Sequence, residues 1–167
     1  MKVPFNYLNY QFQNKKKYFK EWSKLINSSE FTLGPYVDKF EKLFAKYIGV
    51  KHCISTNNGT DALILSLRSL GIKKGDEVIT VTNSFYATAG AIATCGAKIV
   101  FVDSDDRYQI DIKKIERAIT KKTKVILPVH WAGASPDMFK IMRIAKKYNI
   151  KVVEDACMGI GAKLLKK

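Results

Sequence analysis

The stretch DEVITVTNSFYATAGAIATCGAKIVFVD, residues 76–103, determines the fold class of this chain. Its two ends, 77–81 and 98–102, are short runs of mostly apolar and β-branched residues, which are typical of buried strands. The small residues between them suit a closely packed helix. A strand, a helix and a second strand in this order predict a parallel pair joined by a helical crossover.

The same rhythm continues on both sides of this stretch. We expect strands to begin near residues 51, 77, 98, 124 and 151, and a helical pattern follows each of them except the last. Asp111 is the predicted N-cap of one helix, and Ser135 that of another, with Pro136 in its first position. The predicted fold class is α/β, with a mostly parallel sheet and helices on both faces.

The N-terminal part does not share this rhythm. Residues 1–30 are aromatic and polar without clear periodicity, and we expect an arm or a peripheral helix there. A helix that ends near Gly49 is predicted next, because four residues share one helical face: Val37, Phe40, Phe44 and Tyr47.

Composition narrows the function classes. The chain has 167 residues, and 47% of them are hydrophobic, which is enough for a core. There is no apolar run of membrane-spanning length and no signal-peptide core, so we expect a cytoplasmic protein. The net charge is +14, but 25 lysines against 4 arginines, spread along the chain, argue against nucleic-acid recognition. Three scattered cysteines, Cys53, Cys95 and Cys157, predict reduced, mostly buried thiols rather than a metal site.

Ligands of open α/β sheets gather at the carboxyl ends of the strands. At the first of these ends, Gly59 would let the backbone approach a ligand, while the helix start and the Thr60 hydroxyl would offer donors to an anion. The alternative there is an ordinary capped helix start. At the second end, Phe85 either stacks on a flat ring or is a core aromatic.

The third strand end reads FVDSDDR and contains Asp103 and Asp105. This spacing resembles the nucleophile motif of haloacid-dehalogenase-type phosphatases, whose acids bind Mg²⁺ and attack a phosphoryl group. Arg107 stands where that family has threonine or valine. The alternative is a simple acidic loop.

At the fourth end, Asp155 closes an apolar strand. A partly desolvated carboxylate requires a cationic partner, and a protonated pyridine nitrogen is one. A phosphate cradle, a ring-stacking aromatic and an acid for the pyridine nitrogen together describe a single cofactor, pyridoxal 5'-phosphate.

Six motifs stand in the order NGTDAL, GDEVIT, NSFYATAGAI, GAKIVFVD, ITKKTKVILPVHWAGASPDM and KVVEDAC. In this order they resemble the DegT/StrS sugar aminotransferases, which are fold-type-I pyridoxal-phosphate enzymes. The resemblance runs from Phe31 to Ala162. It implies that residues 31–167 are the N-terminal part of a cofactor-binding large domain.

The resemblance implies a role for each matching residue. Gly59 and Thr60 would bind the cofactor phosphate, with Asn58 adjoining them. Phe85 would stack on the pyridine ring, and Asp155 would pair with its nitrogen.

Two features depart from the family. Met158 stands where the family has glutamine or histidine to bond the cofactor's phenolic oxygen, and a thioether is a feeble acceptor. The family's Schiff-base lysine lies some tens of residues beyond the EDA motif, so we expect the chain to stop before it. Lys163, Lys166 and Lys167 are interpreted as surface lysines.

For the intact enzyme, the resemblance implies a homodimer that transfers an amino group, with glutamate as the donor, to a keto sugar linked to a nucleotide. The fragment alone is expected to be inactive. Two alternatives remain open. One is a non-catalytic aminotransferase remnant, and the other is the phosphatase that would use Asp103 and Asp105.

Overall fold

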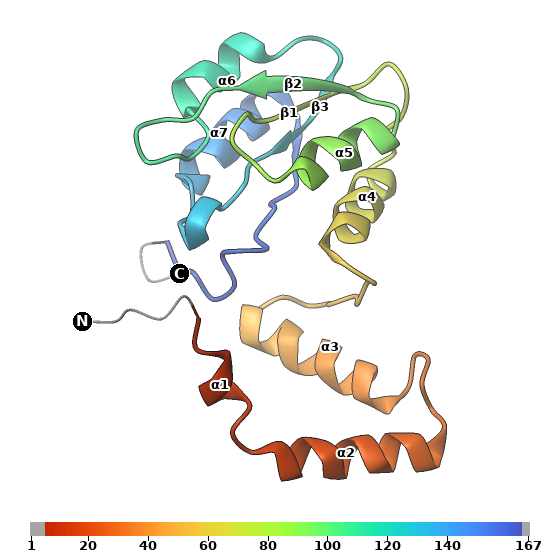
Figure 1. Ribbon diagram of the computed structural model, residues 1–167. Coiled ribbons are helices and arrows are strands. Elements are labelled where there is room, and N and C mark those ends of the chain that lie inside the picture. The colour runs from red at the N-terminus through yellow and green to blue at the C-terminus, as the bar shows by residue number, and fades with distance from the viewer. Residues whose placement is uncertain (1–5, 165–167) are drawn as a thin grey trace, which may run out of the picture. The chain divides into compact units, whose positions relative to one another are not determined.

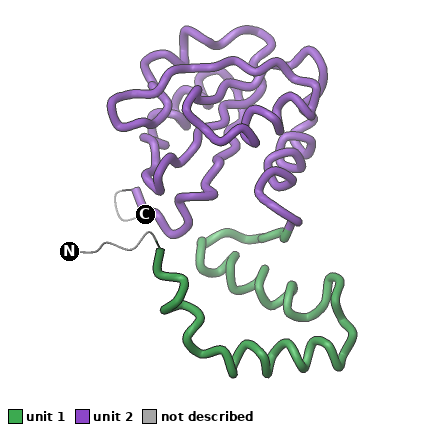
Figure 2. Tube along the Cα trace, viewed as in Figure 1, with its two compact units in different colours: residues 1–55 green, residues 56–167 purple. Residues whose placement is uncertain are grey.

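A computed structural model describes residues 6–164 of the chain. The chain divides into two compact units, residues 1–55 and residues 56–167 (Figure 2). Among the described residues, no helix is both long enough and apolar enough to cross a membrane.

Unit 2 is built on a four-stranded parallel sheet (Figure 1). Its strand order is β2-β1-β3-β4. The strands are β1 (Glu77–Val81), β2 (Lys98–Val102), β3 (Thr123–Leu127) and β4 (Lys151–Val152). The helices are α4 (Gly59–Ser69), α5 (Tyr86–Thr94), α6 (Ile112–Ala118), the 3-10 turn η1 (Trp131–Gly133) and α7 (Met138–Tyr148).

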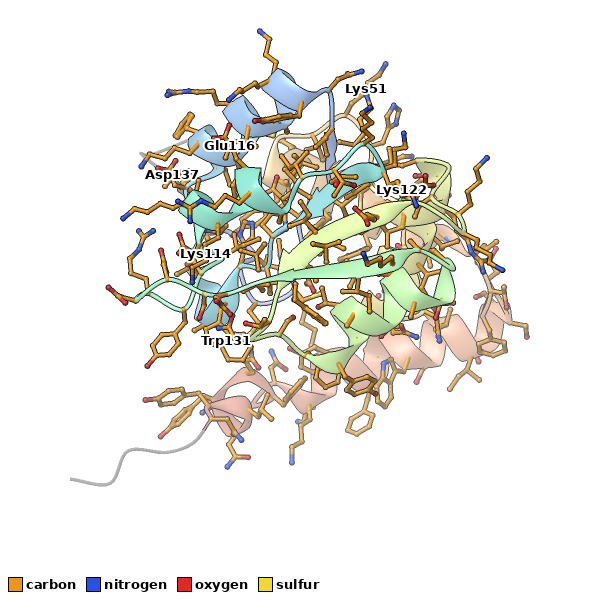
Figure 3. The ribbon with its side chains drawn as sticks, turned by 90° about the horizontal axis from the view of Figure 1, so that it is seen from above. Lys51, Lys114, Glu116, Lys122, Trp131 and Asp137 are labelled. Carbon is orange, nitrogen blue, oxygen red and sulfur yellow. The ribbon has the colours of Figure 1, made fainter. Side chains whose placement is uncertain are left out.

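Helices cover both faces of this sheet. β2 lies on one side of β1 and β3 on the other, so the two crossover connections run in opposite directions across the sheet. Because both crossovers are right-handed, α5 and α6 lie on opposite faces. α4 packs against α5, and α6 packs against α7. Seen from above, the sheet lies between α5 on one side and α6 with α7 on the other (Figure 3). The predicted α/β class is confirmed.

The core lies where the two central strands meet the helices. Ile79 of β1 and Ile126 of β3 are fully buried, and so is Ile92 of α5. The alanines and the glycine of α5 let this helix approach the sheet closely, as its small-residue composition predicts. The edge strand β2 is only partly covered, and Phe101 on it is 52% exposed.

Unit 1 is helical. It contains α1 (Leu8–Gln11), α2 (Lys15–Ser28) and α3 (Pro35–Ile48). The Tyr36 hydroxyl of α3 donates a hydrogen bond of 3.1 Å to Glu21 of α2. The predicted helical face is confirmed on α3, where the Phe40 and Phe44 rings stack with centroids 5.4 Å apart. Gly49 ends α3 with a φ of +79°, a conformation that glycine adopts without strain.

Two local predictions are wrong. No strand forms at residues 51–56, where Ile54 is 81% exposed, and among the described residues this segment pairs with no strand of the sheet. α7 begins at Met138, because the Asp137 carboxylate accepts a hydrogen bond from the Lys140 N–H and is therefore the N-cap in place of Ser135. The predicted N-cap at Asp111 is confirmed.

Candidate functional site

A cavity of about 320 Å³ lies at the carboxyl ends of the central strands of unit 2. This is the size and the place expected of a small-molecule site in an α/β sheet. The six residues that the sequence singles out for a cofactor all line it: Asn58, Gly59, Thr60, Phe85, Asp155 and Met158. The fold therefore brings together residues that are nearly a hundred positions apart in the chain.

The first wall of this cavity is the N-terminus of α4. The Asn58 side chain is the N-cap and accepts a hydrogen bond of 2.9 Å from the Asp61 N–H. The preceding N–H groups, of Gly59 and Thr60, have no acceptor in the first turn of a helix. Neither these groups nor the Thr60 hydroxyl is hydrogen-bonded to another part of the chain that the structure describes. Three donors at the positive end of a helix dipole suit an anionic group.

Gly59 also stands where the backbone has little room. A Cβ atom at this position would lie 3.1 Å from the Cys157 Sγ atom, which is tighter than ordinary van der Waals contact. Because Gly59 has no side chain, the start of α4 and the segment after Asp155 can approach each other closely.

Phe85 forms a second wall. It is the residue before α5, and its extended backbone places the ring outside the helix. The ring is 63% exposed and leans on the Tyr86 ring, with centroids 4.3 Å apart. Phe85 is therefore not a core aromatic, and its free face suits a planar ligand.

Asp155 forms the floor. Its backbone N–H donates to the Pro128 carbonyl, and its own carbonyl accepts from the His130 N–H, so it is held beside the end of β3. The residue is 8% exposed. Its Oδ2 atom accepts a hydrogen bond of 2.8 Å from the Thr88 hydroxyl, and Oδ1 accepts a long one of 3.4 Å from the Cys157 N–H.

No lysine, arginine or histidine within residues 6–164 forms an ion pair with Asp155. A carboxylate accepts about four hydrogen bonds, so this buried group has unused capacity. Burying a charge without a partner is costly. The site is therefore suited to a ligand that brings a positive charge to Asp155.

Met158 lies at the cavity with 59% of its surface exposed. Met158, the residue at which the sequence departs from the family pattern, thus lines the cavity. A thioether there offers a ligand apolar contact and almost no hydrogen bonding.

Sequence analysis missed several residues of the site. Trp131 lines the cavity and lies shortly after the end of β3 (Figure 3). An aromatic residue at the carboxyl end of a strand was a signal of a ligand site that the sequence offered. Ser84 also lines it, and buried Thr88 stands behind Asp155. Ser84 and Thr88 are four residues apart, but Ser84 precedes α5, so no local pattern of the sequence marked the pair.

The prediction of mostly buried thiols is wrong. Cys53 and Cys95 are half-buried, and Cys157 is exposed at the cavity. Burial of its sulfur, followed by the hydrogen bond to Asp155 and the negative charge of that residue, raises the pKa of Cys157 above its ordinary value. A raised pKa disfavours the thiolate, which is the reactive form of cysteine.

The acidic loop after β2 lies outside this cavity. The Asp103 carboxylate is paired with Lys114 at 3.0 Å, and that of Asp105 with Arg107 at 3.1 Å. Burial opposes ionisation of Asp105, but backbone N–H groups of Gln109 and Arg107 outweigh it and lower the pKa of this carboxyl. Both acids thus have partners within the protein, and these partners compete with a metal ion.

The family model for the DegT/DnrJ/EryC1/StrS aminotransferases matches residues 13–167. The chain belongs to this family. The DegT/StrS resemblance of the sequence motifs is thereby confirmed.

Several known proteins are similar to the chain. It is 45% identical over 165 residues to a pleiotropic regulatory protein of Geobacillus stearothermophilus, covering 98% of this chain and 44% of that protein. It is 45% identical over 140 residues to the 3-oxo-glucose-6-phosphate:glutamate aminotransferase of Bacillus subtilis, covering 83% and 32%. It is 43% identical over 155 residues to the UDP-2-acetamido-2-deoxy-3-oxo-D-glucuronate aminotransferase of Pseudomonas aeruginosa, covering 92% and 43%.

Solved structures of the family have the same fold. NtdA of Bacillus subtilis, solved with its cofactor PMP bound, is 42% identical and superimposes with a TM-score of 0.89, covering 96% of this chain and 38% of that one. The chain spans less than half the length of each of these relatives. The fold described here is therefore part of a larger domain in them.

Proposed function

We propose that this chain carries the cofactor-binding part of a pyridoxal-phosphate-dependent aminotransferase. Its acceptor would be a keto sugar linked to a nucleotide, and its amino donor glutamate. The names of the relatives support this proposal, because one contains a UDP-linked oxo sugar and another contains glutamate. By the same resemblance the whole enzyme is a cytoplasmic homodimer, and residues 31–167 are the first part of its large domain.

One observation carries the proposal. A single cavity has free N–H donors at Gly59 and Thr60, an exposed ring at Phe85 and a buried acid at Asp155. Pyridoxal phosphate presents the matching groups, which are an anionic arm, a planar ring and a ring nitrogen that carries a proton. The donor set therefore fits this cofactor, because the free N–H groups at a helix N-terminus suit a phosphate.

The cofactor, when bound, supplies an electron sink for the bonds broken at the amino carbon. Asp155 would hold a proton on the ring nitrogen, since its ionised carboxylate in a buried place stabilises the positive charge there. Gly59 and Thr60 would anchor the phosphate, and Phe85 would cover one face of the ring and keep water from it. These residues bind and orient the cofactor, and only Asp155 controls a proton.

No lysine lines the cavity within residues 6–164. Lys163 is exposed, as predicted, while Lys166 and Lys167 lie outside the described residues. We therefore propose that the lysine which carries the cofactor and moves the substrate proton belongs to a part of the enzyme beyond these 167 residues.

Titration with pyridoxal phosphate tests the proposed site directly. The cofactor-free protein, prepared at its natural length, is expected to bind one equivalent, with a change in the cofactor's absorbance. Pyridoxal without the phosphate is expected to bind far more weakly, because the donors at Gly59 and Thr60 then have no anion. Equal affinity for the two compounds would contradict the assigned phosphate cradle.

Replacing Phe85 with alanine is expected to weaken binding of pyridoxal phosphate at least about fivefold, since one aromatic pair contributes about 1 kcal/mol beyond its buried area. Thermal stability should stay the same, because the ring is exposed. Phe101→Ala is the control, since Phe101 is also exposed but lies on the edge strand β2 and does not line the cavity. If the two variants weakened binding equally, Phe85 would not be the stacking residue.

Residues 1–167 alone are expected to form no defined lysine adduct with pyridoxal phosphate, because no lysine of the described part lines the cavity. The measurement is borohydride reduction followed by peptide mass spectrometry. Scattered, substoichiometric modification of surface lysines is the expected pattern. A stoichiometric adduct at one lysine would show that this lysine reaches the site.

A further inference from the structure

The Asp155 carboxylate is not held by the cavity wall alone. Behind it stands Thr88 of α5, which is 1% exposed and lies 67 positions earlier in the sequence. Its hydroxyl is 2.8 Å from Asp155 Oδ2 and 2.7 Å from the hydroxyl of Ser84. Three polar side chains therefore form one row that runs from half-buried Ser84 to the floor of the cavity.

The direction of each hydrogen bond in this row follows from the number of protons. An ionised carboxylate only accepts, so the single proton of the Thr88 hydroxyl must point to Asp155. The Thr88 hydroxyl has only this one proton, so it cannot also donate to Ser84. Ser84 must therefore donate its own proton to the Thr88 oxygen. With an ionised Asp155, both hydroxyl protons of the row therefore point toward the carboxylate.

The row also limits how Asp155 can turn. Oδ2 is fixed by a short bond to a side chain that is itself buried, whereas Oδ1 has only the 3.4 Å contact with the Cys157 N–H. One oxygen is thus committed to the protein, and the carboxylate keeps free lone pairs for a ligand. A hydrogen bond to a charged group is stronger than one between neutral groups, so the loss of the Thr88 hydroxyl is expected to weaken binding of the ligand that contacts Asp155.

We infer that Thr88, supported by Ser84, is a positioning residue that orients the ionised Asp155 carboxylate toward the cofactor ring. The inference rests on the proposed function, because it assumes that Asp155 faces a cationic ring nitrogen. Thr88 itself is behind Asp155 and touches no ligand. Its effect on the cofactor passes entirely through the carboxylate.

The test compares variants of the protein at its natural length by titration of the cofactor-free form with pyridoxal phosphate. Thr88→Val keeps the shape and removes the hydroxyl, and it is expected to raise the dissociation constant about tenfold. Thr88→Ser keeps the hydroxyl and loses a methyl group, and its dissociation constant should stay within about threefold of the parent value. Ser84→Ala removes only the outer donor and should have an intermediate effect.

A packing role would reverse this pattern, because Thr88→Val would then be harmless and Thr88→Ser harmful. That outcome, or an unchanged dissociation constant in Thr88→Val, overturns the inference. If Thr88→Val does not fold, Ser84→Ala is compared in the parent and in the Asp155→Ala background, because Ser84 also lines the cavity. An unchanged affinity in the parent, or an equal loss in both backgrounds, overturns the inference.

Asp155→Ala separates this inference from the proposed function. If Asp155→Ala leaves cofactor affinity intact, Asp155 does not pair with the cofactor ring, and the proposed function is contradicted at this residue. If Asp155→Ala weakens binding and Thr88→Val does not, only the positioning role fails. In the Asp155→Ala background, Thr88→Val is expected to change the dissociation constant less than twofold, and a full tenfold effect there would overturn the inference.

Discussion

Asp155→Ala is expected to lower kcat of the natural-length enzyme by roughly 10³-fold. Asp155 is buried, and no cation among residues 6–164 is paired with it, so its charge is available to a protonated ring nitrogen. Without it, the proton on that nitrogen is lost more readily, and the ring withdraws electrons less well. The measurement is the steady-state rate of amino transfer to an oxo sugar nucleotide.

The matched control is Asp103→Asn, which changes an acid on the exposed loop after β2. This variant is expected to retain the parent rate, because its ion pair with Lys114 is on the surface and contributes little. It also tests the alternative phosphatase. A Mg²⁺-dependent phosphatase activity that disappears in Asp103→Asn would favour the acidic loop as the site, and near-normal transamination by Asp155→Ala would show that the wrong acid is assigned.

Leu67→Ala is expected to lower the free energy of unfolding by about 2–5 kcal/mol. Leu67 lies on α4 and is fully buried in the core of unit 2, so its removal leaves a cavity between α4 and its neighbours. Because α4 presents Gly59 and Thr60 to the site, cofactor affinity should fall as well. The measurements are the thermal midpoint of the cofactor-free protein and a titration with pyridoxal phosphate.

Leu65→Ala is the control on the same helix. Leu65 is 53% exposed, and the same chemical change there is expected to cost less than about 1 kcal/mol. If Leu65→Ala were as destabilising as Leu67→Ala, a surface outside these 167 residues would have to cover Leu65. If neither variant mattered, the packing of α4 described here would be wrong.

The sequence predicts most of the fold because hydrophobic periodicity is a local signal. The central strands β1 and β3 are mostly buried runs rich in β-branched residues, and such runs are typical of strands in a parallel sheet. The expected strand at residue 51 shows the limit. A run of strand-like residues becomes a strand only where another strand is beside it, and a local pattern does not tell which neighbours are present.

The site is predictable to a similar extent. Gly59, Phe85 and Asp155 are conspicuous, because each follows a strand or precedes a helix and has a side chain suited to one part of a ligand. Thr88 is not conspicuous, since a threonine within a run of small residues looks like ordinary packing. Its meaning depends on Asp155, 67 positions away, and only the fold brings the two together.

That separation has a consequence for biosynthesis. A ribosome adds about 5–20 residues per second, so several seconds pass between the emergence of Thr88 and that of Asp155. During this interval the hydroxyls of Ser84 and Thr88 have no carboxylate to meet, and the nascent polypeptide lacks the group that would recognise a vitamin B6 nitrogen. Contact between Asp155 and a coenzyme ring would therefore begin only after β4 has joined the sheet beside β3.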